Sequence, residues 1–222
     1  MIEPDLRIPM PAGIPPLILG SGSPRRSALL GELGVPFRIV VSDVAENVNF
    51  DFNSEAQAMA LAERKARAVA AGLETGIVLG ADTIVSLDGE LLGKPVDDAD
   101  AKRMLRLLSG REHRVVTGIA VIDAASGAIK TSAVSSLVRF HVLRDVDIDR
   151  YVATGEPQDK AGAYAIQGRG AGLVSSLDGC FTNVVGLPLC ATARLLGEAG
   201  IPIGATWAGC RSPDGARCPP QV

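Results

Sequence analysis

The chain has 222 residues, of which 47% are hydrophobic and 21% are charged. This composition is typical of a soluble globular protein, and the length fits one domain or one bilobed domain. The formal net charge of −3 argues against a general nucleic-acid or membrane-surface binder. Any binding of anions therefore has to come from cations placed locally.

Hydrophobic periodicity and turn residues divide the chain into strands and helices. Residues 1–16 contain five prolines and are interpreted as a loose arm, residues 17–201 as the folded domain, and residues 202–222 as a disordered tail. In chain order we expect strand 17–19, helix 24–33, strand 37–42, helix 54–71, strand 77–87, helix 98–108, strands 115–122 and 129–143, helix 147–154, a glycine-rich irregular region 156–186, and helix 187–197.

The order of these elements indicates the fold class. Strands and helices alternate early and a strand hairpin follows, which predicts an α/β fold with a mixed sheet. Ser54 and Gln57 have the spacing of a capping box at the start of the long alanine-rich helix.

The cysteines and histidines limit the chemistry. The four cysteines, Cys180, Cys190, Cys210 and Cys218, contain no CxxC pair and are too sparse for a disulfide scaffold. Free thiols in a reducing compartment are the simplest interpretation. With no targeting segment and no run of about 18 apolar residues, we expect a cytoplasmic protein without a membrane span. With only two histidines, a histidine-based zinc site or a Ser-His-Asp triad is poorly supported.

The segment LILGSGSPRR, residues 17–26, is typical of an anion site. A short apolar strand leads through a Gly-Ser loop into a helix with Ser23 at the N-cap and Pro24 at the first helical position. Arg25 and Arg26 oppose the positive end of the helix dipole unless a polyphosphate binds there. The plainer alternative is a surface helix with solvated arginines. The segment matches neither a P-loop nor GxGxxG.

Other charged residues lie in apolar surroundings. On a helical wheel Lys65 falls on the core face, and Asp82 interrupts the apolar strand IVLGADTIV. Lys94 follows on a stiff turn, and Asp43 or Glu46 could add a carboxylate after the strand that ends near residue 42. The alternatives are a snorkelling lysine, a strand-end aspartate that caps the backbone, and a solvated Lys94. Together with the two arginines, these cations and carboxylates suit a polyphosphate with Mg²⁺.

Six separate segments, in order between residues 17 and 196, resemble the Maf family of nucleoside triphosphate pyrophosphatases. They are LGSGSPRR, LAERKA, LGADTIV with its following GKP, SGREHRVVTG, EPQDKAGAYAIQG and NVVGLPL. The resemblance implies a two-lobed single domain with a twisted mixed sheet and a central cleft, similar to inosine triphosphatases. It also implies Mg²⁺- or Mn²⁺-dependent hydrolysis of a nucleoside triphosphate to the monophosphate and pyrophosphate.

The resemblance also implies roles for individual residues. Asp82 would be the catalytic acid-base residue and, with Glu46, a metal ligand. The phosphates would be held by Ser21, Arg26, Lys65 and Lys94. The subgroup that is similar to dTTP and UTP hydrolases carries the combination found here at Arg25, Thr83 and Gln167. A loop containing Asp159, Lys160 and several glycines would cover the base.

Two other functions remain as alternatives. A nucleotidyltransferase also uses a Gly-rich loop with basic residues, but its turnover needs an acceptor other than water. A nucleotide-binding regulator of cell division would bind without significant turnover, although both activities could coexist. The expected partner is a nucleoside triphosphate, with no nucleic-acid polymer and no membrane. The sequence leaves open a homodimer, and which of dTTP, UTP or a modified pyrimidine nucleotide is the physiological substrate.

Overall fold

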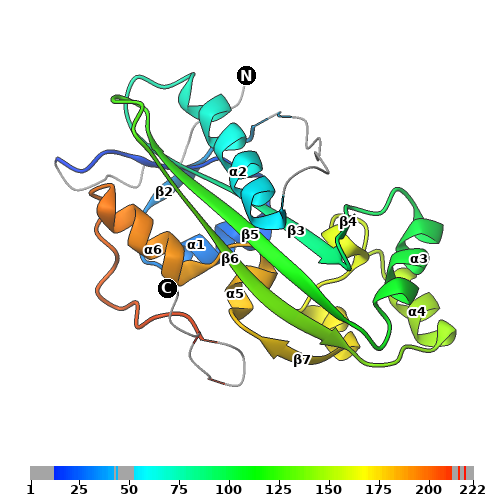
Figure 1. The fold of residues 1–222 in the computed structure, drawn as a ribbon. Helices are drawn as coiled ribbons and strands as arrows, with labels where there is room; N and C mark the ends of the chain where they lie inside the picture. The colour runs from blue at the N-terminus through cyan, green and yellow to red at the C-terminus, as the bar shows by residue number, and fades with distance from the viewer. Residues whose placement is uncertain (1–12, 43, 45–52, 212–214, 216–217, 219–222) are drawn as a thin grey trace.

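A mixed seven-stranded sheet organises the fold (Figure 1). The computed structural model describes residues 13–42, 44, 53–211, 215 and 218. The strand order is β2-β1-β3-β5-β6-β7, with β4 paired to β3; β1 is parallel to β2 and β3, and the other pairs are antiparallel. The strands are β1 (Leu17–Leu19), β2 (Phe37–Ile39), β3 (Ile77–Leu87), β4 (Glu90–Leu92), β5 (Glu112–Asp123), β6 (Ile129–Phe140) and β7 (Val174–Asp178).

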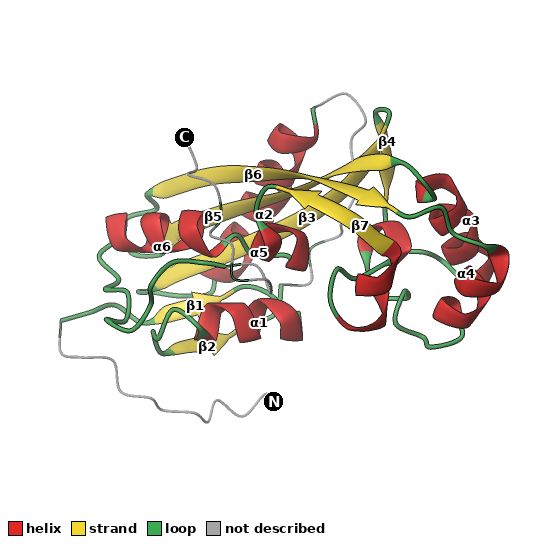
Figure 2. Ribbon diagram, turned by 90° about the horizontal axis from the view of Figure 1, so that it is seen from below, coloured by secondary structure: helices red, strands yellow, loops and turns green. Residues whose placement is uncertain are grey.

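Helices cover both faces of this sheet. Helix α2 lies on one face, and α1, α5 and α6 lie on the other, with α3 and α4 at the far end of the long strands (Figures 1 and 2). The helices are α1 (Pro24–Gly31), α2 (Ser54–Ala70), α3 (Asp98–Leu108), α4 (Asp145–Val152), α5 (Phe181–Val185) and α6 (Leu189–Glu198), with short 3₁₀ turns η1 (Ala161–Ala163) and η2 (Gly168–Leu173). Alternation along β1 explains the two faces: Leu17 and Leu19 pack towards α1 and α6, and Ile18 packs towards α2.

Two large hydrophobic cores lie along the long strands, and two smaller clusters lie between the sheet and α2. One core joins the first half of β3 to α1, α5 and α6, and the other joins the end of β3 to α3 and α4. Ala81 belongs to the first core and Val85 to the second, so the change between lobes falls around Asp82. This arrangement confirms the α/β fold with a mixed sheet in a two-lobed domain.

Helix α2 packs very closely against the sheet at two glycines. A Cβ added to Gly118 on β5 would lie 2.2 Å from the carbonyl carbon of Ala58, and one added to Gly80 on β3 would lie 2.3 Å from the carbonyl oxygen of Ala62. Gly118 is also the register partner of Asp82 across the β3–β5 pair. The two missing side chains therefore let α2 reach the strand that carries Asp82.

Several predicted boundaries were wrong. Residues 156–186, expected to be irregular, contain η1, η2, β7 and α5, since short apolar stretches among the glycines pack onto the sheet. The N-cap of α2 is Asn53, whose side chain accepts from the Ala56 N–H at 2.8 Å, so the capping box expected at Ser54 does not form. Strand β2 ends at Ile39 and helix α1 ends at Gly31, both earlier than expected.

The segment after α6 departs from the disordered tail that its composition suggested. Ile203 and Trp207 pack against the first core, Cys210 is buried, and the Gly204 N–H donates to the Leu33 carbonyl at 2.9 Å. Apolar side chains spaced among the glycines and prolines explain the difference. Of the arm expected at residues 1–16, residues 1–12 lie outside the described residues.

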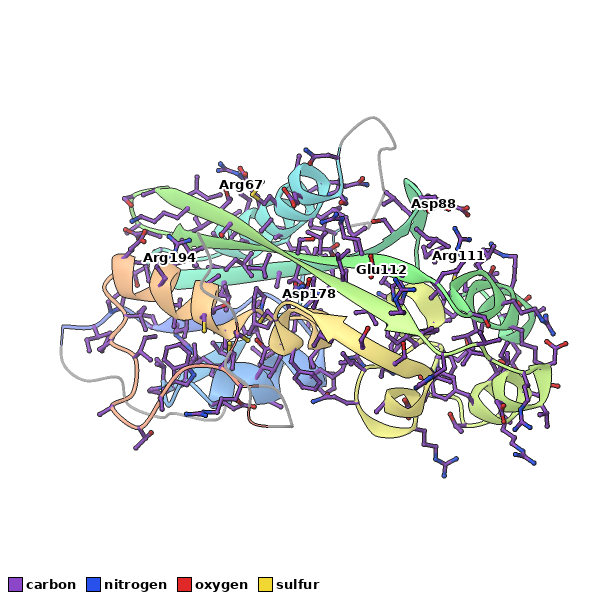
Figure 3. All side chains as sticks on the ribbon, turned by 60° about the horizontal axis from the view of Figure 1, so that its bottom comes forward. Arg67, Asp88, Arg111, Glu112, Asp178 and Arg194 are labelled. Carbon is purple, nitrogen blue, oxygen red and sulfur yellow. The ribbon has the colours of Figure 1, made fainter. Side chains whose placement is uncertain are left out.

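Charged side chains occupy the outer surface. Figure 3 labels Arg67 and Arg194, which pair with Glu63 at 2.7 Å and Glu198 at 3.0 Å one helical turn away. Such exposed pairs contribute about 0.3–0.5 kcal/mol each and do not decide the fold. Within the described residues, no helix combines the length and the apolar character needed to cross a bilayer.

Candidate active site

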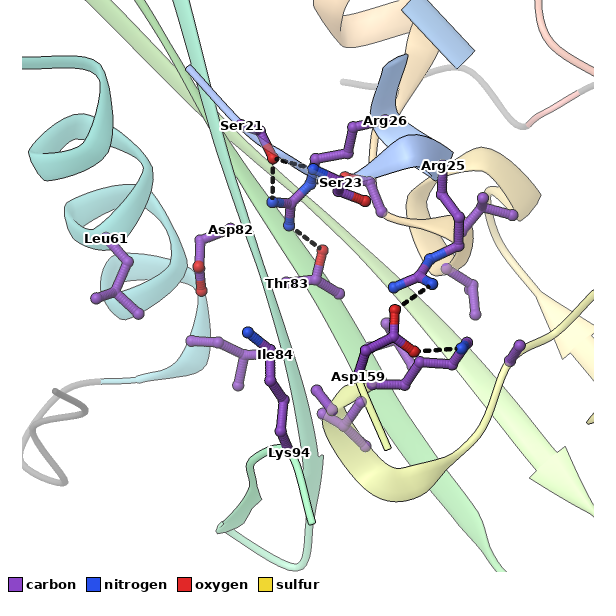
Figure 4. A pocket seen from close by; sticks show the side chains of 18 of the residues that line it. Ser21, Ser23, Arg25, Arg26, Leu61, Asp82, Thr83, Ile84, Lys94 and Asp159 are labelled. Atoms are coloured by element: carbon purple, nitrogen blue, oxygen red, sulfur yellow. Dashed lines mark hydrogen bonds and ion pairs between the residues drawn. The ribbon is translucent and has the colours of Figure 1, made fainter. Parts of the chain in front are cut away.

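A cavity of about 520 Å³ opens between the start of α1, the middle of β3 and the segment 159–167. It lies where β3 passes from one hydrophobic core to the other, and Figure 4 shows it from close by. The structure brings eight of the predicted site residues to its wall: Ser21, Arg25, Arg26, Lys65, Asp82, Thr83, Lys94 and Gln167. Glu46, the ninth, lies outside the described residues.

Lys65 and Asp82 form a buried ion pair in this wall. The Lys65 Nζ lies 2.5 Å from the Asp82 Oδ1, and the side chains are 8% and 10% exposed. The Lys65 ammonium group therefore does not extend to the surface. Asp82 pairs with this side chain instead of capping the end of a strand. Desolvation offsets much of the Coulomb attraction in such a pair, so it is weak evidence for stability and better evidence for a functional role.

Arg26 is fixed by three acceptors. Its guanidinium donates to the Gly186 carbonyl at 2.9 Å, to the Ser21 hydroxyl at 3.2 Å and to the Thr83 hydroxyl at 3.1 Å. Figure 4 shows Ser21 and Thr83 on either side of this guanidinium. Ser23 occupies the N-cap of α1 without a side-chain capping bond. Residues 20–26, which include the start of α1 and Arg26, line the same cavity.

Behind Thr83 a buried polar chain continues to Asn183. The Thr83 and Thr117 hydroxyl oxygens are 2.9 Å apart, and the Thr117 hydroxyl donates to the Asn183 carbonyl at 2.9 Å. The Asn183 amide accepts from the Thr117 N–H at 2.9 Å and donates to the Val115 carbonyl at 3.0 Å. Sequence reasoning missed Asn183, although a single amide in the apolar run FTNVVGLPL was an available signal.

Arg25 reaches across the cavity to the other lobe. Its Nη1 lies 2.9 Å from the Asp159 Oδ2, and the Lys160 Nζ lies 2.5 Å from the Asp159 Oδ1. Although burial raises it, the hydrogen bonds from Lys160 and Arg25 bring the pKa of Asp159 below its ordinary value. The Arg25–Asp159 contact links α1 to the loop expected to cover a bound base (Figure 4).

Glu156 supports the loop that carries Gln167. Its carboxylate accepts from the Gly170 N–H at 3.0 Å, the Arg169 N–H at 3.3 Å and the Tyr151 hydroxyl at 3.0 Å. The Tyr151 hydroxyl in turn accepts from the Ala165 N–H at 3.1 Å. These hydrogen bonds anchor the loop before Gln167, at Ala165, and after it, at Arg169 and Gly170. The backbone is therefore fixed where the Gln167 side chain lines the cavity.

The donor atoms of the cavity suit a hard divalent cation. Asp82 and Asp159 are the carboxylates among the described residues of its lining, and Asp159 is held by Arg25 and Lys160. Mg²⁺ commonly takes one or two protein carboxylates and completes its shell with waters and phosphate oxygens. Asp159 is paired through both oxygens, whereas Asp82 meets Lys65 through Oδ1, so the Asp82 carboxylate fits the role of a metal ligand better.

The chain is similar to known proteins over most of its length. The family model described as Maf-like protein matches residues 16–199. A dTTP/UTP pyrophosphatase of Moorella thermoacetica is 51% identical over 187 residues, which cover 84% of this chain and 96% of the relative. A dTTP/UTP pyrophosphatase of Pelotomaculum thermopropionicum is 49% identical over 184 residues, which cover 83% and 96%. A third, of Symbiobacterium thermophilum, is 49% identical over 187 residues, which cover 84% and 95%.

Proposed function

Since the chain belongs to the Maf family, we propose that it hydrolyses dTTP and UTP to the monophosphate and pyrophosphate. The observation that carries this proposal is the buried Lys65–Asp82 pair in the wall of a cavity that Arg26 and Lys94 also line. Lys65, Arg26 and Lys94 in the same cavity wall as Asp82 suit a triphosphate, whose charge has to be balanced while water attacks it.

The reaction is an in-line attack of water on the α-phosphorus. The new bond joins the water oxygen to the α-phosphorus, and the bond from this phosphorus to the bridging oxygen breaks, so that pyrophosphate leaves. Asp82 orients the water and takes its proton. Lys65, 2.5 Å from Asp82, fixes the carboxylate and balances its charge. No nucleophilic side chain is required, which agrees with the scarcity of histidine.

The phosphates are held by groups that the fold has already oriented. Arg26 is fixed by Ser21, Thr83 and the Gly186 carbonyl, so little side-chain entropy is lost when it meets phosphate. With Lys94, it stabilises charge on the departing pyrophosphate. We propose Mg²⁺ or Mn²⁺ as cofactor, held by Asp82 and Glu46. When bound, such a cation neutralises phosphate charge and polarises the phosphorus–oxygen bond.

The choice of a pyrimidine is proposed to involve Arg25, Thr83 and Gln167. The Gln167 amide can donate and accept at once, which matches the carbonyl and N–H edge of uracil or thymine. Arg25 holds the covering loop through Asp159 at 2.9 Å. Thr83 acts through Arg26, since its hydroxyl accepts from that guanidinium at 3.1 Å. We also propose a cytoplasmic location, which the four cysteines, none in a disulfide, support.

Product analysis tests this function. The full chain is incubated with Mg²⁺ and dTTP, UTP, CTP, dATP, GTP or a methylated guanine nucleotide, and monophosphate and pyrophosphate are quantified. We expect both products from dTTP and UTP and little from the purines. Products from the methylated guanine nucleotide instead would refute the pyrimidine specificity but not the chemistry. Binding without release of any product would favour the regulator.

A paired substitution tests the role of Asp82. Asp82→Asn should lower kcat by roughly 10³-fold, because a positioned general base contributes about 10²–10⁴-fold to the rate and asparagine cannot take the proton. Asp178→Asn is the matched control, since Asp178 is exposed on β7 (Figure 3). Near-normal turnover in Asp82→Asn, with the control unchanged, would eliminate Asp82 as the catalytic residue.

A further inference from the structure

All four cysteines of the chain come together at one place outside the cavity. Cys180 precedes α5, Cys190 lies in α6, and Cys210 and Cys218 follow in the segment after α6. The Cys190 and Cys210 sulfurs are 3.0 Å apart, those of Cys180 and Cys218 are 3.2 Å apart, and those of Cys180 and Cys210 are 4.0 Å apart. We call this group the cysteine cluster.

The spacing of the cluster matches ligands that share one ion. The sulfurs of Cys180, Cys210 and Cys218 all lie within 4.8 Å of one another, and in the described part of the chain no other three His, Cys, Asp or Glu ligands do so. Four thiolates at about 2.3 Å from a tetrahedral zinc ion lie about 3.8 Å from each other. Within this set the separations of 3.2 and 4.0 Å lie near that value. Cys190 lies outside the set, 3.0 Å from Cys210, and has to turn towards the ion to become the fourth ligand.

Two disulfide bonds explain the arrangement less well. A disulfide joins two sulfurs at about 2.05 Å and leaves them as a separate pair. Here Cys210 lies close to both Cys190 and Cys180, while Cys180 also lies close to Cys218, and none of the separations is a bonding distance. The two shortest separations pair Cys190 with Cys210 and Cys180 with Cys218, and the 4.0 Å contact between Cys180 and Cys210 joins these pairs into one group.

We propose that Cys180, Cys190, Cys210 and Cys218 bind one structural zinc ion as thiolates. All four positions are filled by protein, as in structural zinc sites, so no position is left for a substrate. Each thiol that binds the ion releases its proton to solvent, and no sulfur changes oxidation state. The Thr182 hydroxyl, 3.2 Å from the Cys180 sulfur, can donate to this thiolate and orient it.

The zinc ion joins the segment after α6 to the core. Cys180 and Cys210 are buried, Cys190 and Cys218 are half-buried, and the Cys218 N–H donates to the Cys210 carbonyl at 3.3 Å. Metal binding therefore adds its free energy to the folding of this segment. It explains how a stretch rich in glycine and proline keeps Trp207 and Ile203 against the first core.

Metal analysis of the full chain tests the proposal. After expression in zinc-supplemented medium and chelator-free purification, we expect about one zinc per chain. The double variant Cys210→Ser/Cys218→Ser should lose this zinc and unfold at a lower temperature. It is preferred to Cys180→Ser because Cys180 lies at the start of α5, where a substitution endangers the fold. Asp82→Asn, altered only in the cavity, should keep the full zinc content.

Cobalt substitution and thiol counting supply independent readouts. The metal-free, reduced chain loaded with Co²⁺ should show the sulfur-to-cobalt charge-transfer and visible bands of a tetrahedral thiolate site, and the double variant should lack them. Alkylation after denaturation should modify all four cysteines of the zinc-loaded chain. Two disulfides in that chain, iron in place of zinc, four free thiols that bind neither metal, or zinc retained by the double variant would each overturn the proposal.

Discussion

The close packing of α2 makes a sharp prediction for Gly118→Ala. The added Cβ would lie 2.2 Å from the Ala58 carbonyl carbon, where ordinary contacts begin at 3.4 Å. The atoms met are backbone atoms of α2, so no side chain can rotate away. The helix has to move from β5 by about 1 Å, which is the difference between the two distances.

This movement affects both stability and activity. Overpacking of a tight core costs about 1–3 kcal/mol of unfolding free energy. Lys65 travels with α2, so its 2.5 Å contact with Asp82 lengthens. A displacement of about 1 Å at a reacting group can lower the rate about 10²-fold. We therefore expect kcat to fall far more than partial unfolding explains.

Urea unfolding and pyrophosphate release at saturating dTTP measure the two effects. Gly197→Ala is the control, because Gly197 lies exposed in α6 with nothing within 4 Å of its added Cβ; it should gain about 0.5–1 kcal/mol. Trimming Ala58 to glycine should not rescue Gly118→Ala, since the clash is with backbone. A Gly118→Ala variant with unchanged stability and unchanged kcat would refute the argument that this packing places Lys65.

Three further predictions concern stability. Burial lowers the pKa of His113 from 6.5 to about 4. The unfolded chain takes up a proton at this histidine more readily than the folded chain, so the unfolding free energy is retained above pH 6.5 and falls towards pH 4, by about 2 kcal/mol between pH 7 and 5. Urea titrations at several pH values should show this dependence, and His113→Phe should reduce it. Asn183→Ala leaves the buried Thr117 N–H and Val115 carbonyl without their amide partner, so it should cost about 3 kcal/mol in chemical denaturation and also lower kcat; an unchanged midpoint would show that water replaces the amide. Asn53→Ala removes the α2 cap and should lower the unfolding free energy by about 1 kcal/mol with little change in kcat; a cost below about 0.3 kcal/mol would count against the cap.

Helical periodicity and apolar runs in the sequence predicted α2 and the central strand β3. The period of α2 placed Lys65 on the buried face, and the apolar run around Asp82 gave the central strand. Eight of the nine predicted site residues reach one cavity. Ser21, Arg25 and Arg26 lie in the strand-loop-helix segment 17–26, whose local pattern sets the backbone there, and the roles of the set as a whole came from the family resemblance. The ninth, Glu46, stays a prediction.

Long-range packing decided what the sequence did not reveal. The cysteines are separated by whole helices and loops, so nothing in their spacing predicted that their sulfurs would meet. Asn183 depends likewise on β5 for its hydrogen bonds. The glycines of residues 156–186 suggested irregular structure, but the apolar residues between them settle onto a sheet formed elsewhere in the chain.

The hydroxyl chain behind the cavity has a fixed direction. Thr117 uses its one proton on the Asn183 carbonyl, so the 2.9 Å contact with Thr83 requires Thr83 to be the donor. On the side of the cavity the Thr83 hydroxyl can then only accept hydrogen bonds, and it accepts one from Arg26. In the proposed role in base choice, Thr83 would act on a nucleotide through the orientation of the Arg26 guanidinium and would not donate a proton to it. A serine there would conserve this polarity, whereas a valine would end the chain and remove one of the three acceptors that orient Arg26.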